Sequence, residues 1–294
     1  MNHNNTTQRI VVGVDGSAYA AHAALWAAAL AALRGSTLHL VHALNVTGAS
    51  SLLTRLSFDE YKLRRTKDGE ELLDAARADL LGRFPGLWVT SEIAEADPVQ
   101  ALVALSADAA LVVAGVRGHG GFAGLPLGSV SLRLAAHCRC PAVFVPLQSA
   151  QPTSRPDGEV ILGIEAREPT AVVAFAFSLA AELGASVRAV HAWEMIPPYN
   201  GYYYIDPALL KAGAESVLAD ALTQTYEEHC LDVRLSRSAV CDRPAAALAD
   251  AARDARLLVL GSHRHRTPLS VGLGPILHAL LTHAPCPVAV VPVS

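Results

Sequence analysis

Short apolar runs alternate with longer amphipathic stretches along the whole chain. In the first half we expect strands at 9–15, 37–44, 87–94, 109–115 and 141–146, and helices at 18–34, 59–84, 98–107 and 129–138. Runs of Val, Ile and Leu that alternate with helices are typical of a parallel sheet buried on both faces. Because crossovers between parallel strands are right-handed, the pattern predicts a doubly wound α/β sandwich with a five-stranded sheet.

The second half of the chain repeats the first. The segments "RIVVGVDGS" (9–17) and "HCRCPAVFVP" (137–146) return as "EVILGIEAR" (159–167) and "HAPCPVAVVP" (283–292). Four such matches keep their order at offsets of 146 to 150 residues, which indicates a duplicated domain rather than a solenoid. The second set of strands is expected at 159–165, 186–193, 232–240, 256–261 and 287–292. We therefore predict a disordered tail at 1–8, domains at 9–147 and 159–294, and a polar linker at 148–158.

The composition argues against several classes of function. The 294 residues are 52% hydrophobic with a formal net charge of −4, and lysine occurs only at positions 62, 67 and 211. No polybasic face for nucleic acid can be built from so few lysines, and the charged run at 58–71 is expected to be a solvated helix face. The polar start lacks the apolar core of a signal peptide, and no apolar run reaches the roughly 20 residues of a membrane helix. We expect a cytoplasmic protein that binds neither nucleic acid nor membrane.

The cysteines and histidines leave more than one interpretation open. Cys138 and Cys140 form a Cys-x-Cys pair that could bind a metal or act in redox chemistry. However, Cys140-Pro141 recurs as Cys286-Pro287 before an apolar run, which favours buried structural thiols. His42 and His191 occupy equivalent strand positions and are likewise expected to be structural. The run "SHRHR" (262–266) lacks carboxylate or thiol partners, so no metal site is expected.

The stretch "GVRGHGGFAGLPLGSVS" (115–131) places six glycines between a predicted strand and a predicted helix. Glycines let the main chain approach a ligand closely, and a helix start offers unpaired N–H groups and a partial positive charge to a phosphate. Gly128 to Ser131 would form that helix start, with serine hydroxyls able to cap the helix or reach an anion. A Walker loop is excluded because no lysine is near, and Ala123 breaks the pattern G-x-G-x-x-G. A flexible loop without a ligand is the alternative.

These residues resemble the universal stress protein family. The spacing Gly115-x2-Gly118-x9-Gly128-Ser129 is similar to the family's ATP-binding signature, and "GVDGS" after the first strand matches as well. The resemblance covers nearly the whole chain and looks like the tandem proteins of actinobacteria. It implies two Rossmann-like domains of the universal stress protein fold with strand order 3-2-1-4-5, a homodimer, and a protein partner that the sequence does not identify.

Carried over residue by residue, the resemblance implies an ATP site in the first copy. Gly13 and Asp15 would line its adenosine side, and Ala43 would touch the adenine through its backbone. The rest of the implied ATP-binding set comprises Gly115, Arg117, Gly118, His119, Gly120, Gly121, Gly128, Ser129, Val130 and Ser131. We expect Mg²⁺ or Mn²⁺ to accompany ATP, because its four charges exceed what Arg117 and a helix dipole offset.

The second copy keeps the spacing of this site and changes its chemistry. The corresponding positions are Gly163, Glu165, Gly261, Arg264, Gly274 and Pro275. Glu165 replaces Asp15 and would be aimed into the same pocket, Arg264 would fill space that a phosphate needs, and Pro275 removes an amide donor. We expect a degenerate second site, unless Arg264 turns outward and contacts phosphate itself.

The resemblance implies an ATP-binding regulator that acts in stress or dormancy, and the residues favour little or no ATP hydrolysis. Phosphoryl transfer needs positioned cations and a water-orienting base, and the glycine-rich stretch supplies neither a lysine nor an obvious base. The alternatives are a slow ATPase or nucleotide-transferring enzyme, and a scaffold with a relic nucleotide site.

Overall fold

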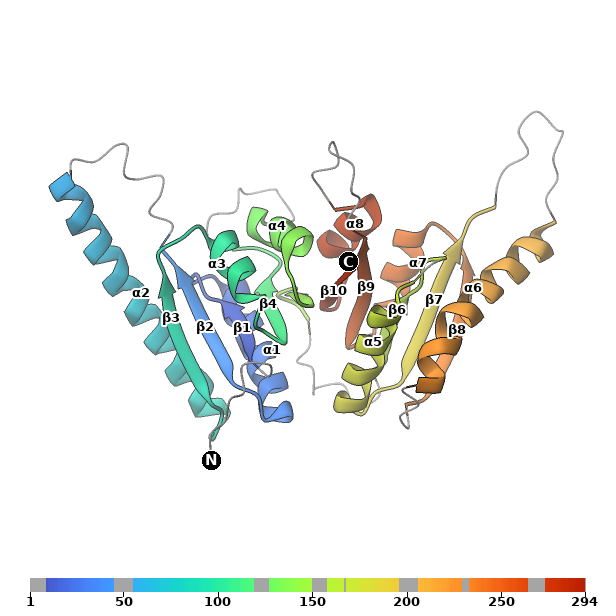
Figure 1. Cartoon of the computed structure of the whole chain (residues 1–294), viewed down its shortest axis with the longest axis horizontal. Helices are drawn as coiled ribbons and strands as arrows, with labels where there is room; N and C mark the ends of the chain where they lie inside the picture. Colours follow the sequence, from blue (N-terminus) through green and yellow to red (C-terminus); the bar gives the residue numbers. More distant parts are fainter. Residues whose placement is uncertain are drawn as a thin grey trace. The chain divides into compact units, whose positions relative to one another are not determined.

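The computed structural model describes residues 9–44, 55–118, 127–149, 158–166, 168–195, 206–228, 233–263 and 273–293. The chain divides into two compact units, Met1–Leu147 and Gln148–Ser294. Each unit has a parallel sheet of five strands packed with helices, so the predicted fold class is confirmed (Figure 1). Among the helices of the described ranges, none is long and apolar enough to cross a membrane.

The first unit has one strand, β1, at the centre of its sheet. Its described elements are β1 (Ile10–Gly13), α1 (Ala18–Arg34), β2 (Leu38–Ala43), α2 (Arg55–Arg83), β3 (Val89–Ala94), α3 (Pro98–Leu105), β4 (Leu111–Gly115), α4 (Ser129–His137) and β5 (Ala142–Val145). The strand order is β3-β2-β1-β4-β5, and Ile10 lies beside both Leu38 of β2 and Leu111 of β4. The order of connection therefore reverses between β1 and β4.

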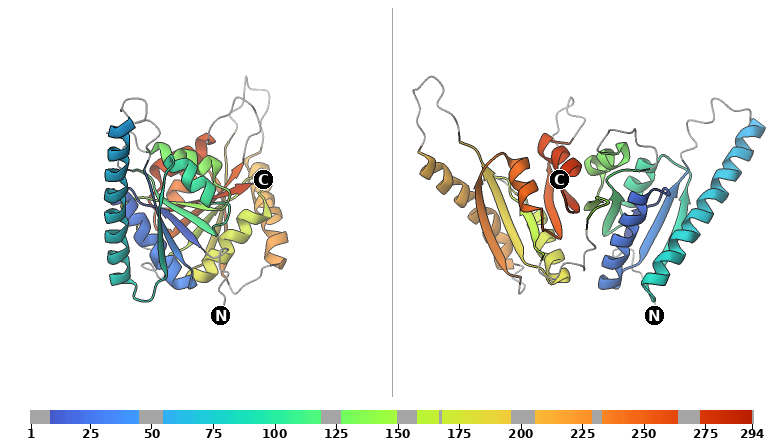
Figure 2. Two further views of the ribbon diagram at one scale, coloured as in Figure 1. Left: turned by 60° about the vertical axis from the view of Figure 1, so that its left-hand side comes forward. Right: turned by 180° about the vertical axis from the view of Figure 1, so that it is seen from behind.

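Two pairs of helices cover this sheet. α1 packs on β1, β4 and α2, whereas α3 packs on α4, β1 and β2 (Figure 2). Trp26 and Leu30 of α1 are fully buried against the sheet. The Ser17 hydroxyl caps the start of α1 by accepting a hydrogen bond from the Ala20 N–H at 3.1 Å. Gly35 ends α1 with a φ of 64°, in the left-handed conformation that favours glycine.

The second unit repeats this arrangement. Its described elements are β6 (Val160–Gly163), α5 (Thr170–Leu183), β7 (Val187–Trp193), α6 (Pro207–Glu228), β8 (Leu235–Cys241), α7 (Pro244–Ala251), β9 (Leu257–His263), α8 (Pro275–His283) and β10 (Val288–Val293). The strand order is β10-β9-β6-β7-β8, so β6 takes the central place of β1. α5 packs on α6, and α7 packs on α8.

The predicted elements are found with boundaries shifted by a few residues, and one shift matters for the site. β4 ends at Gly115, where the chain bends away. Its counterpart β9 was predicted to end at Gly261 but continues to His263, which pairs with Val293 of β10. The two copies thus diverge at the residue where the glycine-rich stretch begins.

Candidate functional site

The carboxyl ends of β1 and β4 lie side by side at the centre of the first sheet. Open parallel sheets bind their ligands at such a point, where the strand order reverses. Asp15 follows β1, while Arg117 and Gly118 follow β4. The fold therefore brings together the two segments of the predicted site.

Asp15 and Gly118 approach each other closely at this edge. One carboxylate oxygen of Asp15, Oδ1, accepts a hydrogen bond from the Ser17 N–H at 2.9 Å, which ties the side chain to the start of α1. The other oxygen faces Gly118, because a Cβ atom added to Gly118 would lie 2.5 Å from Oδ2. Any side chain at position 118 would displace the Asp15 carboxylate. The absence of a side chain at Gly118 therefore lets its backbone lie directly against the Asp15 carboxylate.

A histidine of β2 also holds the turn that carries Asp15. The ring Nδ1 of the buried His42 donates to the carbonyl of Val14 over 2.8 Å, which confirms the structural role predicted for this histidine. His191 makes the same bond to Ile164 in the second unit, also over 2.8 Å. Gly16 has a φ of 83°, which an L side chain rarely adopts.

The glycine-rich stretch is closed at its base. The Gly128 N–H donates to the carbonyl of Val116 over 2.9 Å, so the two ends of the stretch meet. A Cβ atom on Gly128 would lie 3.4 Å from the Cα of Arg117, which is ordinary van der Waals contact. His119, Gly120 and Gly121 lie outside the described residues.

α4 begins directly after this closure, with Gly128 as its N-cap. A glycine offers no side-chain acceptor, so it leaves the N–H groups of Ser129, Val130 and Ser131 to another acceptor. Ser129 is exposed at the helix start. The Ser131 hydroxyl is buried and donates to the Gly115 carbonyl over 2.8 Å. That hydroxyl holds α4 against the end of β4, so of the two predicted serine hydroxyls only the one on Ser129 is exposed.

Three more predicted residues of the first copy are the last residues of their strands. A Cβ on Gly115 would lie 2.8 Å from the backbone carbon of Tyr19, so this glycine lets α1 pack against β4. A Cβ on Gly13 would lie 3.1 Å from the Leu102 side chain of α3. Ala43 is the last residue of β2 and lies beside Ala94 of β3.

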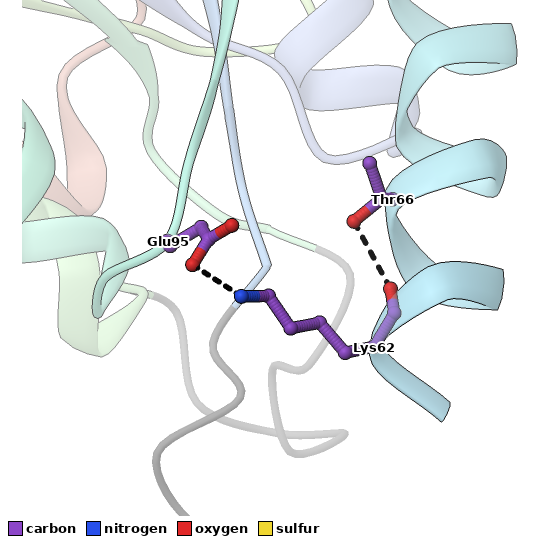
Figure 3. Close-up of polar contacts among 3 residues, drawn as sticks. All are labelled: Lys62, Thr66 and Glu95. Carbon is purple, nitrogen blue, oxygen red and sulfur yellow. Dashed lines mark hydrogen bonds and ion pairs between the residues drawn. The ribbon is translucent and has the colours of Figure 1, made fainter. Parts of the chain in front are cut away.

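Two cations that sequence reasoning missed lie near the carboxyl end of β3. Lys62 of α2 forms an ion pair with Glu95, with 2.6 Å between Nζ and Oε2 (Figure 3). Arg133 of α4 pairs with Asp97 at 3.8 Å. Lys62 and Glu95 are 33 residues apart in the sequence, and α2 brings them together only in the folded chain. Figure 3 also shows the Thr66 hydroxyl donating to the Lys62 carbonyl, within α2.

A separate groove of about 460 Å³ lies between α2 and β3. Its lining includes the carboxylates of Glu70, Asp74, Glu92 and Glu95. Such a lining repels phosphate groups, so the groove is a poor candidate for nucleotide binding.

In the second unit the half-buried carboxylate of Glu168 lies against β9. Glu168 Oε2 accepts a hydrogen bond from the Glu165 N–H at 2.9 Å, and a Cβ on Gly261 would lie 2.6 Å from Oε1. Oε1 is buried without a hydrogen-bond partner among the described residues. Burial raises the pKa of Glu168 to about 7. The carboxylate that lies against Gly261 is therefore that of Glu168. Glu165, which was expected to aim into the pocket, is exposed.

Three other predicted positions of the second copy have roles in packing or at a helix start. A Cβ on Gly163 would lie 2.6 Å from the Leu260 side chain, so this glycine serves packing. Gly274 is the N-cap of α8 and Pro275 lies in its first turn, where proline is well tolerated. Among the described residues, no atom lies within 4 Å of a Cβ on Gly274. Arg264 falls outside the described residues, so it stays a prediction that it fills the space of a phosphate, and so does the alternative that it contacts phosphate.

Comparison with known proteins gives a consistent result for both units. The model of the universal stress protein family matches residues 6–146 and 159–292. A universal stress protein of Mycobacterium tuberculosis is 32% identical over 286 residues, covering 96% of each chain. Another from this species is 34% identical over 269 residues, covering 89% of each chain. A solved universal stress protein structure from Archaeoglobus fulgidus has a TM-score of 0.70 at 17% identity, covering 97% of this chain and 98% of that one.

Proposed function

The chain belongs to the universal stress protein family, and on this premise we propose that its first domain binds ATP with Mg²⁺ or Mn²⁺. The protein would act in the cytoplasm as a nucleotide-dependent regulator of a stress or dormancy response. One observation carries the proposal: the backbone of Gly118, which has no side chain, lies against the Asp15 carboxylate, and α4 begins nearby without a side-chain cap. A close backbone approach and a helix start are the features that suit a phosphate chain.

The charges around Asp15 and Gly118 favour a divalent cation that binds together with ATP. The Asp15 carboxylate and the phosphates of ATP would repel each other without a cation between them. Mg²⁺ is commonly held by one or two carboxylates together with substrate phosphates. Lys62 and Arg133 are each paired with a carboxylate after β3, which limits their use as counter-ions.

The same charges support binding with little or no hydrolysis. Efficient phosphoryl transfer needs positioned cations and a residue that orients the attacking water. Asp15 is already tied to the Ser17 N–H through Oδ1. We therefore assign no catalytic residue and expect turnover far below the typical enzyme median of about 10 per second.

Calorimetric titration of the full-length chain with Mg²⁺-ATP tests the proposal. Gly118→Trp displaces the Asp15 carboxylate and places an indole after β4, so it should abolish binding. Gly274→Trp is the control, because it places the same side chain in the second unit, at the N-cap of α8, where no atom of the described residues lies within 4 Å of a Cβ. Thermal unfolding checks that both variants fold. Unchanged affinity in a folded Gly118→Trp variant would refute the site.

We further propose that the protein forms a homodimer and that ATP controls its contact with a second, unidentified protein. The support is the family membership of both units. Light scattering with and without Mg²⁺-ATP measures the oligomeric state directly. A monomer at every nucleotide concentration would contradict the dimer.

A further inference from the structure

The turn between α4 and β5 contains a buried pair of thiols. Cys138 is the C-cap of α4, and Cys140 follows two residues later, before β5. Both thiols are free, and the residues are 4% and 8% exposed. The two side chains share a hydrogen bond, while Arg139 between them is exposed to solvent. Both thiols are therefore buried, while the residue between them lies at the surface.

The second unit shows that the fold needs only one of these cysteines. The equivalent C-cap of α8 is Ala284, with φ −62° and ψ 134°, against −58° and 140° at Cys138. The Cys286 sulfur lies 3.4 Å from the Pro287 carbonyl oxygen, and the Cys140 sulfur lies at the same distance from that of Pro141. Cys140 and Cys286 thus have the same packing role, as the sequence predicted. Cys138 is an addition that the turn geometry does not require.

A serine accompanies this extra cysteine. Ser106, the C-cap of α3, donates its hydroxyl to the Val103 carbonyl over 2.7 Å and accepts the Arg139 N–H at 2.9 Å. It also hydrogen-bonds the Cys138 side chain. Its counterpart, the C-cap of α7, is the buried Ala252. The first unit therefore has a polar cluster of Ser106, Cys138 and Cys140 where the second has two alanines and one cysteine.

This cluster gives the two thiols different chemical roles. The hydrogen bond from Cys140 stabilises a thiolate at Cys138 and lowers the pKa of Cys138 to about 7. The same bond raises the pKa of Cys140, which keeps its proton. Because the thiolate is the nucleophilic form of cysteine, Cys138 is the attacking group and Cys140 the resolving group.

From this cluster we propose that Cys138 and Cys140 are a modification site, which a hydroperoxide oxidises to an intramolecular disulfide. The Cys138 thiolate attacks a peroxide oxygen and breaks the O–O bond, which gives a sulfenic acid and releases an alkoxide that leaves as the alcohol after protonation. The Cys140 sulfur then loses its proton and attacks the Cys138 sulfur, displacing hydroxide, which leaves as water. Two thiols are oxidised while one hydroperoxide is reduced to alcohol and water.

Timed oxidation of the full-length protein by hydrogen peroxide at pH 7 tests this proposal. Remaining thiols are alkylated, and mass spectrometry follows each cysteine. A thiol with a pKa near 7 is half ionised at this pH, whereas an ordinary cysteine with a pKa of about 8.5 is about 3% ionised. Because a thiolate of lower pKa is also a weaker nucleophile, part of this gain is offset, and we expect Cys138 to react roughly threefold faster than Cys286. Burial is matched in this comparison, since Cys138 is 4% and Cys286 3% exposed.

The product and two variants complete the experiment. Cys138 and Cys140 should lose their alkylation together, and their shared peptide should lose the mass of two hydrogens. Cys138→Ala recreates the turn of the second unit, so it should fold normally and leave Cys140 as slow as Cys286. Cys138→Ser gives the same comparison if the alanine variant is unstable. Oxidation of Cys138 no faster than that of Cys286, or a sulfinic acid at Cys138 beside an alkylatable Cys140, would overturn the proposal.

Discussion

At the residue scale, Gly115 sets the distance between α1 and β4. A Cβ at this position would lie 2.8 Å from the backbone of Tyr19, so Gly115→Ala forces the helix away from the sheet. Overpacking of this kind costs about 1–3 kcal/mol, and we expect a loss of stability of that size in chemical unfolding. Gly82→Ala in α2 is the control, because nothing lies within 4 Å of its Cβ. It should stabilise the chain by roughly 0.5–1 kcal/mol, and a loss at both positions would contradict the packing argument.

Glu168 makes the stability of the second domain depend on pH. Burial raises its pKa to about 7 in the folded chain, from an ordinary value of 4.5. Folding therefore favours the protonated form, and the stabilisation is complete below pH 4.5 and is lost as the pH rises through 7.

Glu168→Gln is neutral at every pH and should avoid this loss. We expect the variant to be more stable than the natural chain by about 1–3 kcal/mol at pH 8, and nearly equal to it at pH 4.5. Thermal unfolding at both pH values measures the difference. Glu215→Gln, at a side chain that is 58% exposed, should show no such pH dependence. An equal effect of Glu168→Gln at both pH values would show that the carboxyl is not held in a buried position.

At the element scale, one aspartate joins two helices beside the site. Asp97 Oδ1 accepts the Val99 N–H at 3.0 Å at the start of α3, and it pairs with Arg133 of α4 at 3.8 Å. Asp97→Ala should cost about 1 kcal/mol, the usual price of a lost N-cap. Hydrogen exchange of the first turn of α3 should become faster. Arg243→Ala is the matched control, because Arg243 is the N-cap of α7 and makes no side-chain cap bond.

The elements also show where prediction from sequence reached its limit. Periodicity predicted α1 at its observed bounds, because Ser17 and Gly35 cap it locally. The end of β9 was missed, because residues 262 and 263 continue as a strand by pairing with Pro292 and Val293 of β10. A pairing with a strand about 30 residues away leaves no signal in the local pattern of residues.

At the scale of the whole molecule, the two units share a fold and differ in what stands at the central strand ends. In the first, the Asp15 carboxylate lies against Gly118, whereas in the second the carboxyl of Glu168 lies against Gly261, the counterpart of Gly115. Pro275 also removes one amide donor from the helix start of the second unit that would face a phosphate. The loss of one charged hydrogen bond alone costs about 1.5–3 kcal/mol, and a factor of ten in affinity is about 1.4 kcal/mol.

We therefore predict one ATP per chain at micromolar nucleotide, with a second site at least about a hundredfold weaker. Calorimetry reports the stoichiometry directly. Two equally occupied sites per chain would contradict the prediction. In that case Arg264→Gly distinguishes the reason, since it weakens the second site only if Arg264 itself contacts the phosphates.

The sequence by itself determined the duplication, the strand and helix pattern, the order of domains and the spacing of the glycines, because these depend on neighbours along the chain. Only the tertiary structure decided which atoms meet. Asp15 follows β1 and meets Gly118 after β4, and Lys62 of α2 pairs with Glu95 after β3. Glu168 likewise places a buried carboxylate oxygen against Gly261, which belongs to a distant strand. The Ser131 hydroxyl was predicted to be able to reach an anion, yet it bonds the Gly115 carbonyl sixteen residues away. Such contacts depend on how helices seat against the sheet, and no local pattern of residues encodes that geometry.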